Sequence, residues 1–230
     1  MSRPPTISSR RHGLILLALV IAAAGVVLIG VAVSAQRSAP QPPRSVGRTG
    51  SGPESSSAPS SPRLTPSTGR APLGASSPLS ISIPSIGVHS RVLPIGLAAD
   101  GTLAVPKPGP NLDKAAWFKN SPTPGQPGPA VIEGHVDSQK GPSVFFELGK
   151  MRPGNKIEVT RADGVVAVFT VNAVRDYPKS AFPTRLVYGA ADLGRPELRL
   201  ITCSNFNASI GHHTGNEVVF ANLTATHPAP

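Results

Sequence analysis

The 230-residue chain has a single cysteine, Cys203, and only 4% of its residues are aromatic. A lone cysteine excludes an internal disulfide, so the fold must depend on an apolar core. The sequence also lacks heptads, internal repeats and long amphipathic helical patterns, which excludes coiled coils and solenoids. It shows no zinc-finger, recognition-helix or RNA-binding signature. We therefore expect no cofactor, no metal and no nucleic-acid partner.

Acidic residues are scarce, with 12 Asp and Glu against 22 Lys and Arg, for a net charge of +10. The imbalance is concentrated in residues 1–77, where eight arginines face one glutamate and give a net charge of +7. The remaining residues carry a net charge of only +3. The excess of positive charge thus belongs to the N-terminal part, where it suits contact with anionic lipid or a cell-wall polymer.

Residues 13–35 contain no charged side chain and are long enough to cross a bilayer as a helix, which takes about 20 residues. Arg3, Arg10 and Arg11 precede this run, so residues 1–12 are predicted to be cytoplasmic and the rest of the chain extracellular. A cleaved signal peptide ending at Ala35 is the alternative. We favour a single-pass membrane anchor because the run exceeds the length of a signal-peptide core.

Two further regions follow the predicted anchor. Residues 36–77 are rich in Ser, Pro and Gly and have no aromatic residue, which predicts a disordered, extended linker. Residues 78–230 are enough for one domain with its own core.

The domain is predicted to be all-β, because short apolar runs with strand periodicity alternate with turn signals. About eight strands with this spacing are typical of a closed barrel or a sandwich. We expect one helical turn at 113–118, with Trp117 anchored in the core. Turns are expected at 89–90, 98–101, 152–155 and 162–164. The predicted strands are 79–88, 91–97, 102–105, 130–138, 143–148, 156–160, 165–174, 198–203 and 217–222.

Cys203 is predicted to lie where a strand runs out into a loop, since residues 198–203 alternate and polar residues follow. Such a place fixes the backbone and leaves the sulfur accessible, as a nucleophile requires. A second predicted strand end carries His135, which could assist a thiolate. The alternative is that Cys203 is a small buried apolar residue.

The motifs around these two residues resemble those of sortases, and most closely the actinobacterial class F (class E/F-type) group. The similarity extends from about residue 79 to residue 223. It is carried by Gly-Pro-Ala-Val-Ile-Glu-Gly-His-Val-Asp-Ser at 128–138, Phe-Phe-Glu-Leu at 145–148, Arg-Pro-Gly at 152–154, Ala-Phe-Pro-Thr at 181–184, Val-Tyr-Gly at 187–189 and Glu-Leu-Arg-Leu-Ile-Thr-Cys at 197–203.

The resemblance implies an eight-stranded sortase β-barrel with short helices and a cysteine transpeptidase activity. It implies that Cys203 attacks an LPXTG-like sorting signal and forms a thioacyl enzyme, which an amine of a cell-wall precursor or a pilin lysine resolves. His135 would protonate the leaving amine, and Thr202 would order the cysteine strand. The implied biological role is to anchor surface proteins to a Gram-positive cell wall.

One expected residue is missing. Sortases carry an arginine on the strand after the cysteine loop, but no arginine follows Cys203. Aligned with the family, Thr214 falls at that position and Asn216 at the following asparagine. His213 or Asn216 could replace the arginine as a hydrogen-bond donor to the substrate, and so could His212. Arg185 or Arg199 could also reach the site from another strand.

Two acidic residues lie near His135 in the sequence. Asp137 could bind calcium, orient His135 or cap a turn, and Glu133 is expected at the surface. His212 and His213 lack the acidic or thiol ligands that a metal site would need.

The missing arginine leaves two interpretations open: an active sortase, or a sortase fold with weakened catalysis that binds sorting-signal peptides. A third, an L,D-transpeptidase, is disfavoured because its Ser-x-Gly-Cys motif is absent.

Overall fold

The computed structural model describes residues 39–41, 70–189 and 194–230. The predicted cytoplasmic segment 1–12, the predicted anchor 13–35 and most of the predicted linker 36–77 lie outside these ranges. Within them, none of the helices has the length and apolar character needed to cross a membrane.

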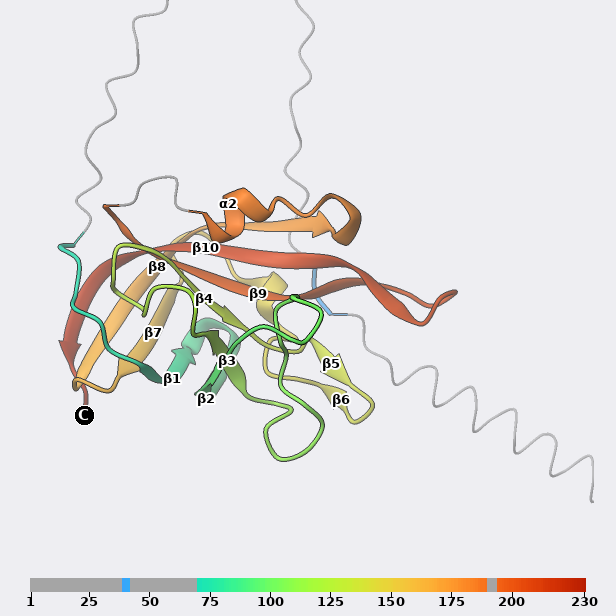
Figure 1. Cartoon of the computed structure of the whole chain (residues 1–230), viewed down its shortest axis with the longest axis horizontal. Helices are drawn as coiled ribbons and strands as arrows, with labels where there is room; N and C mark the ends of the chain where they lie inside the picture. The colour runs from blue at the N-terminus through green and yellow to red at the C-terminus, as the bar shows by residue number, and fades with distance from the viewer. Residues whose placement is uncertain (1–38, 42–69, 190–193) are drawn as a thin grey trace, which may run out of the picture. The chain divides into compact units, whose positions relative to one another are not determined.

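Eight strands close into a barrel in the order β1-β2-β3-β4-β9-β10-β8-β7, as Figure 1 shows. The all-β prediction with eight barrel strands is therefore confirmed. A separate two-stranded sheet pairs β5 with β6. The barrel strands are β1 (Pro78–Ile83), β2 (Val88–Ile95), β3 (Ala115–Phe118), β4 (Gly128–Glu133), β7 (Lys156–Arg161), β8 (Val165–Pro178), β9 (Pro196–Asn207) and β10 (His212–Pro228), and the small sheet contains β5 (Asp137–Ser138) and β6 (Gly141–Pro142).

The interior of the barrel is filled by alternate side chains of its strands. On β9, Leu198 and Leu200 point inward and are fully buried, and on β7 Ile157 and Val159 do the same. Trp117 also belongs to this core and donates from Nε1 to the carbonyl of Pro122, so its predicted place in the core is confirmed. This packing removes a large apolar area from water, which is the main favourable term in folding.

The predicted turn at 89–90 is wrong. The chain reverses earlier, through the short 3-10 helix η1 (Pro84–Ile86), so that β1 ends at Ile83 and β2 begins at Val88. Pro84 fits the first helical position, and Gly87 follows with a left-handed φ of 66°.

Three short segments also differ from the prediction. The expected helical turn at 113–118 contains β3, which pairs in parallel with β2 and antiparallel with β4. The expected strand 143–148 consists of turns leading into η2 (Leu148–Lys150). The expected strand 102–105 has only one bridge, between Leu97 and Leu103. An apolar run of only four to six residues indicates that its side chains are buried, but it does not distinguish a strand from a turn or a short helix.

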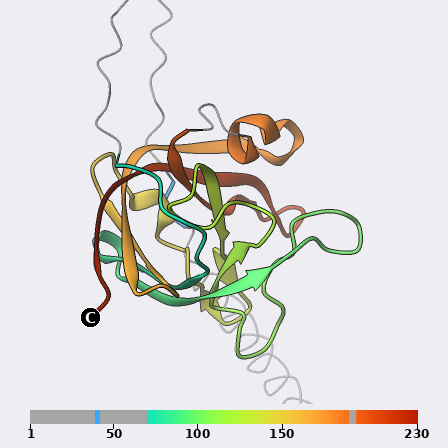
Figure 2. The same ribbon diagram turned by 60° about the vertical axis from the view of Figure 1, so that its left-hand side comes forward.

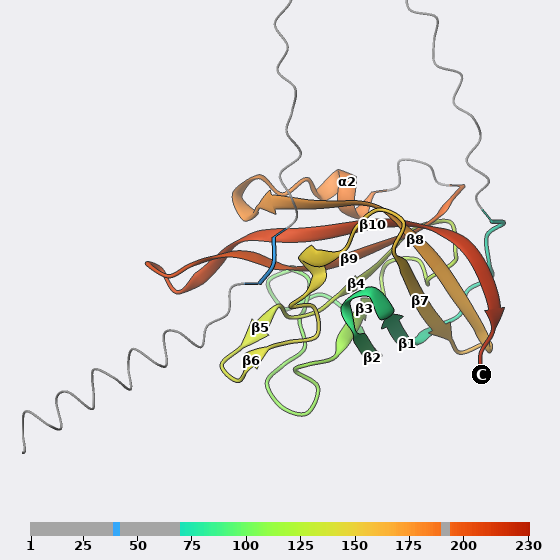
Figure 3. The same ribbon diagram turned by 180° about the vertical axis from the view of Figure 1, so that it is seen from behind.

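Strands β9 and β10 are longer than predicted. Their pairing continues from Asn222 and Glu197 to His212 and Asn207. Figures 1 and 3 show this pair projecting as a ribbon beyond the rest of the barrel.

A second, smaller apolar cluster lies on the outer face of the barrel wall. It contains Val131, Ile201 and Val218 from the strands and Val187 from α2 (Thr184–Tyr188). In Figure 2, α2 lies over the outside of the strands. Outward side chains of β4, β9 and β10 are therefore covered near this helix.

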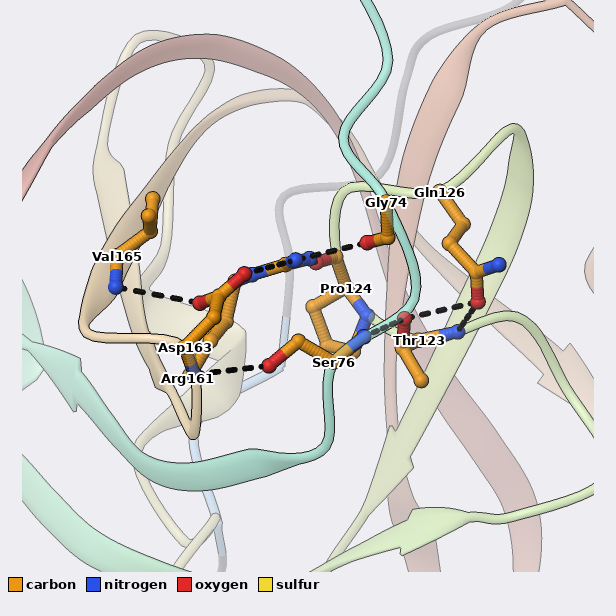
Figure 4. Close-up of polar contacts among 8 residues, drawn as sticks. All are labelled: Gly74, Ser76, Thr123, Pro124, Gln126, Arg161, Asp163 and Val165. Carbon is orange, nitrogen blue, oxygen red and sulfur yellow. Dashed lines mark hydrogen bonds and ion pairs between the residues drawn. The ribbon is translucent and has the colours of Figure 1, made fainter.

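The segment that leads into β1 is fixed to the barrel by Arg161, as shown in Figure 4. The Arg161 side chain is 1% exposed. It donates to the carbonyl oxygens of Gly74 and Pro124 and to the carboxylate of Asp163. The amide of Asp163 in turn donates to the hydroxyl of Ser76 at 3.0 Å. Ordered contacts thus begin ahead of Pro78.

Candidate active site

The parallel pairing of β4 with β9 ends close to both His135 and Cys203. Along this pair Ile132 lies opposite Leu200 and Glu133 opposite Ile201. The amide of Gly134 then donates to the carbonyl of Ile201 at 3.1 Å, which extends the register past the end of β4. His135 directly follows the last backbone bond on this side, and Cys203 follows Thr202 on β9, so both residues lie just beyond the paired part of the two strands.

A buried hydrogen bond fixes this arrangement. The hydroxyl of Thr202 donates to the carbonyl oxygen of Gly134 at 2.8 Å. Thr202 is 4% exposed, and a bond in such a place is costly to break because the carbonyl would lose its partner. Thr202, which we predicted to order the cysteine strand, also ties that strand to the backbone just before His135.

Gly134 is required by close packing. A Cβ atom at this position would lie 2.6 Å from Cγ1 of Val144 and 2.8 Å from Cδ2 of Phe145. Phe145 is fully buried, and its amide donates to the carbonyl of His135 at 3.0 Å. The turn that was predicted as a strand thus packs beneath the backbone of His135.

The His135 ring is held by a carbonyl group. Its Nε2 lies 2.8 Å from the carbonyl oxygen of Pro106. A carbonyl only accepts, so Nε2 must carry a proton and donate. The other ring nitrogen, Nδ1, is then the atom that is left to exchange a proton with a substrate.

Cys203 lies within β9 and not at its end, contrary to the prediction. It is half-buried, and the β4 pairing ends just before it while the β10 pairing continues. Ile201, two residues earlier, belongs to the outer cluster, so Cys203 also points to the outer face. One edge of its strand is therefore free of a ladder partner.

The sulfur has a cationic neighbour that the sequence analysis missed. Nζ of Lys179 donates to Sγ of Cys203 at 3.7 Å. Lys179 begins the short 3-10 helix η3 (Lys179–Ala181) directly after β8. No local sequence signal marks this lysine, because its proximity depends on the register of three strands.

The residues predicted to replace the arginine are spread along β10. Asn216 lies directly opposite Cys203 and is half-buried. Thr214 is exposed, and its hydroxyl donates to the carbonyl of Asn205 at 3.0 Å. Asn216 is therefore the cross-strand neighbour of Cys203, whereas the Thr214 hydroxyl is bonded to the backbone of β9 two residues beyond Cys203.

His213 is placed away from Cys203. It pairs with Phe206 across the ribbon, with ring centroids 5.2 Å apart. Its Nε2 lies 3.0 Å from Oδ1 of Asp137. Asp137 thus contacts His213 and not His135, and the pair links the ribbon to β5. His212 is exposed. In the part of the chain that the structure describes, no group of three or more potential metal ligands occurs.

The part of β9 just after Cys203 is linked to β8 by Asp176. Its carboxylate accepts hydrogen bonds from the hydroxyl of Ser204 and from the side-chain amide of Asn205. Asn205 has a left-handed φ of 55°, a conformation that asparagine tolerates better than most residues. The regular β9–β10 pairing is therefore interrupted at Asn205 and resumes at Phe206.

Glu133 was expected at the surface, and this is wrong. It is 6% exposed, because it lies on the outer face of β4 opposite Ile201, near α2. Burial raises the pKa of Glu133 to about 8. Its Oε1 has no hydrogen-bond partner. A second buried carboxyl, Glu217, has its pKa raised to about 8 by burial and by the charge of Asp176.

Arg199 and Arg185, which we considered as replacements for the missing family arginine, lie in different surroundings. Arg199 is 4% exposed, bonded to Glu197 at 2.5 Å and stacked 4.6 Å over the ring of Phe220. The Arg199 guanidinium group is therefore already held by partners in the wall of the barrel. Arg185 is exposed on α2.

Comparison with known proteins places this geometry in a family. The profile of the sortase domain matches residues 81–224, more than half of the chain. A search of curated proteins finds no match. Among solved structures, sortase A from Corynebacterium diphtheriae is 21% identical, with a TM-score of 0.50 over 67% of this chain and 64% of that one. Sortase C-1 from Actinomyces oris is 19% identical, with a TM-score of 0.50 over 64% of this chain and 73% of that one.

These two structures show that the barrel has the fold of sortases, and the profile match covers both Cys203 and His135. Sortases are cysteine transpeptidases. The chain belongs to the sortase family.

Proposed function

We propose that this protein is a cysteine transpeptidase that cleaves an LPXTG-like sorting signal and transfers the acyl group to an amine. The observation that carries the proposal is the parallel β4–β9 pair, which ends just before His135 on one strand and just before Cys203 on the other, in a chain of the sortase family. The motifs described above favour the class F type.

In the first step the Cys203 thiol gives its proton to Nδ1 of His135, and the resulting thiolate attacks the carbonyl carbon of the scissile amide. The C–S bond forms while the carbonyl π electrons move onto oxygen and give a tetrahedral oxyanion. The oxyanion collapses, the C–N bond breaks, and His135 gives a proton from Nδ1 to the leaving amine. A thioester remains on Cys203, and an incoming amine resolves it by the reverse sequence.

The outer face beside Cys203 offers a surface for an apolar peptide. On this face the half-buried rings of Phe182 and Tyr188 pack over the buried cluster of Val131, Ile201 and Val218. The Leu and Pro residues of a sorting signal would gain from burial on such a surface. This supports an apolar sorting motif close to the nucleophile.

The acceptor is proposed to be the amine of a cell-wall precursor or of a pilin lysine. This part of the proposal rests on the family resemblance and on the net charge of the N-terminal region. With residues 13–35 as a membrane anchor and residues 36–77 as a linker, the catalytic domain would act at the outer surface of the cell.

The test is cleavage and transpeptidation of quenched LPXTG-type peptides. We expect the wild type to be active and Cys203→Ala to be inactive. His135→Ala should lose about 10²–10⁴-fold in kcat, the usual contribution of a general acid. Cleavage that persists in Cys203→Ala would contradict the proposal.

A second candidate is a peptide-binding sortase fold with weakened catalysis. The observation that favours it is Thr214, which stands at the aligned arginine position and directs its hydroxyl to Asn205. On this account the wild type binds peptide without cleaving it, and Thr214→Arg gains activity.

A further inference from the structure

Lys179 occupies a defined position in the strand register around Cys203. Cys203 lies opposite Asn216 on β10, and Asn216 lies opposite Tyr177 on β8. In the next row Ser204, Gly215 and Pro178 are aligned in the same way. One step further along both strand pairs, Lys179 comes beside Thr214.

This position is adjacent to the one where the family arginine is missing. Thr214 has a short side chain that turns to the carbonyl of Asn205, and Gly215 has none. Lys179, coming from the far side of β10, has a long stem and reaches the sulfur with its ammonium group. The cationic group of Lys179, in η3 directly after β8, therefore reaches Cys203 across β10.

The ammonium has no competing acidic partner among the described residues. Its hydrogen bond goes to the Cys203 sulfur. The nearby carboxylate of Asp176 is engaged by Ser204 and Asn205. Arg199 is held by Glu197 and Phe220, and neither lysine nor arginine follows Cys203 in the sequence.

We propose that Lys179 is a catalytic residue that takes the role of the missing arginine by donating a hydrogen bond to the substrate oxyanion. The inference rests on the proposed transpeptidase function. When the C–S bond forms, negative charge develops on the carbonyl oxygen within reach of the ammonium. Lys179 transfers no proton in this step, and the proton given to the leaving amine still comes from His135. The electrons return from oxygen when the C–N bond breaks.

The first test is the kinetics of the full chain on the LPXTG-type peptide. Lys179→Met should lower kcat by about 10²–10³-fold, as loss of an oxyanion donor does, and leave KM nearly unchanged. Lys179→Arg keeps the charge and should stay within about tenfold of the wild type. Lys140→Met, at an exposed lysine on the β5–β6 turn, is the matched control. In the Lys179→Met background, Thr214→Arg should restore at least about tenfold.

The second test does not depend on peptide cleavage. Alkylation of Cys203 by anionic iodoacetate and neutral iodoacetamide is compared in each variant. An ammonium beside the sulfur favours the anionic reagent, so the ratio of the two rates should fall about threefold to fivefold in Lys179→Met. The ratio should not change in Lys140→Met.

The outcomes separate the two proposals. A Lys179→Met variant whose kcat equals that of Lys140→Met overturns the role of Lys179 and leaves the transpeptidase function standing. A wild type without Cys203-dependent cleavage defeats the transpeptidase function. In that case only the ratio of the iodoacetate and iodoacetamide rates tests the role of Lys179. A lower ratio in Lys179→Met than in the wild type supports a cationic site at Cys203, and an unchanged ratio overturns it.

Discussion

The hydrogen bond from Thr202 to Gly134 links the two candidate catalytic residues through the backbone. Thr202 precedes Cys203 and Gly134 precedes His135, so a single bond of 2.8 Å sets the spacing of both. Its position behind the site, in the interior of the barrel, keeps it out of contact with substrate. Its role is therefore one of positioning.

Replacing Thr202 by valine should loosen the site. The Gly134 carbonyl would lose its partner, at a cost of about 1–3 kcal/mol in the free energy of unfolding. We also expect kcat to fall while KM changes little, because His135 would no longer be fixed. Thr202→Ser keeps the hydroxyl and should keep kcat. Equal kcat values in the valine and serine variants would show that this bond does not position the site.

Glu133 makes stability depend on pH. Its pKa is about 8 in the folded protein, against 4.5 for an exposed glutamate carboxyl. The folded state therefore holds its proton more tightly than the unfolded state does. The stabilisation of the folded state by protonated Glu133 is fully present below about pH 4.5 and is lost as the pH rises towards 8.

Glu133→Gln should remove this dependence. Within the window between the two pKa values, each pH unit costs the wild type about 1.4 kcal/mol of unfolding free energy through this group. Denaturant unfolding at pH 5 and at pH 8 measures the difference. The variant should lose clearly less stability between these two values. Glu158→Gln, at a half-buried position on β7, is the control and should keep the wild-type profile.

At the scale of elements, the strands with clear alternation were predicted well. The β7–β8 hairpin and its turn at 162–164 are confirmed by the pairing of Lys156 with Thr170 through Thr160 with Val166. The same alternation of apolar and polar residues along these strands also predicts which side chains fill the barrel interior. In contrast, β3 has only four residues, too few to show a period, and its pairing with β2 and β4 is decided by contacts distant in sequence.

The candidate site was predicted only in part. His135 and Cys203 lie at breaks in apolar runs, which a sequence can show. Lys179 and the burial of Glu133 depend on strand register and on the position of α2, and neither leaves a local pattern. Asp137 and His213 were both noted, but not their contact, which joins two strands, β5 and β10, that are far apart in the chain.

The contact between His213 and Asp137 should steady the β9–β10 ribbon. We expect His213→Ala to speed amide hydrogen exchange near the ribbon tip, around 205–212, because both the hydrogen bond with Asp137 and the contact with Phe206 are lost. His212→Ala, at the exposed neighbouring position, is the control. Unchanged exchange in His213→Ala would mean that backbone pairing alone holds the ribbon.

At the scale of the whole domain, Arg161 joins the segment before β1 to two loops. Its removal leaves the carbonyls of Gly74 and Pro124 without this donor in a buried place. Arg161→Met should therefore lower the free energy of unfolding by about 2–5 kcal/mol. Arg91→Met, at an exposed position on β2, is the control and should change it by less than about 0.5 kcal/mol. A small effect at Arg161 would show that this segment is not tied to the barrel.

The segment before β1 also packs closely against Gly125. A Cβ at Gly125 would lie 2.6 Å from Cδ1 of Leu73, and the φ of Gly125 is 104°. Gly125→Ala should destabilise the domain for both reasons. Thermal unfolding measures the effect, and a variant as stable as the wild type would contradict this packing.

The central claim is that Cys203 carries the acyl group, and the direct measurement is mass spectrometry of the protein during reaction with an LPXTG-type peptide. We predict a mass increase equal to the N-terminal peptide fragment, located on Cys203, absent in Cys203→Ala and discharged when an amine is added. If no acyl group is found on Cys203 while the peptide is cleaved, or if no peptide of this type is cleaved at all, the account is contradicted.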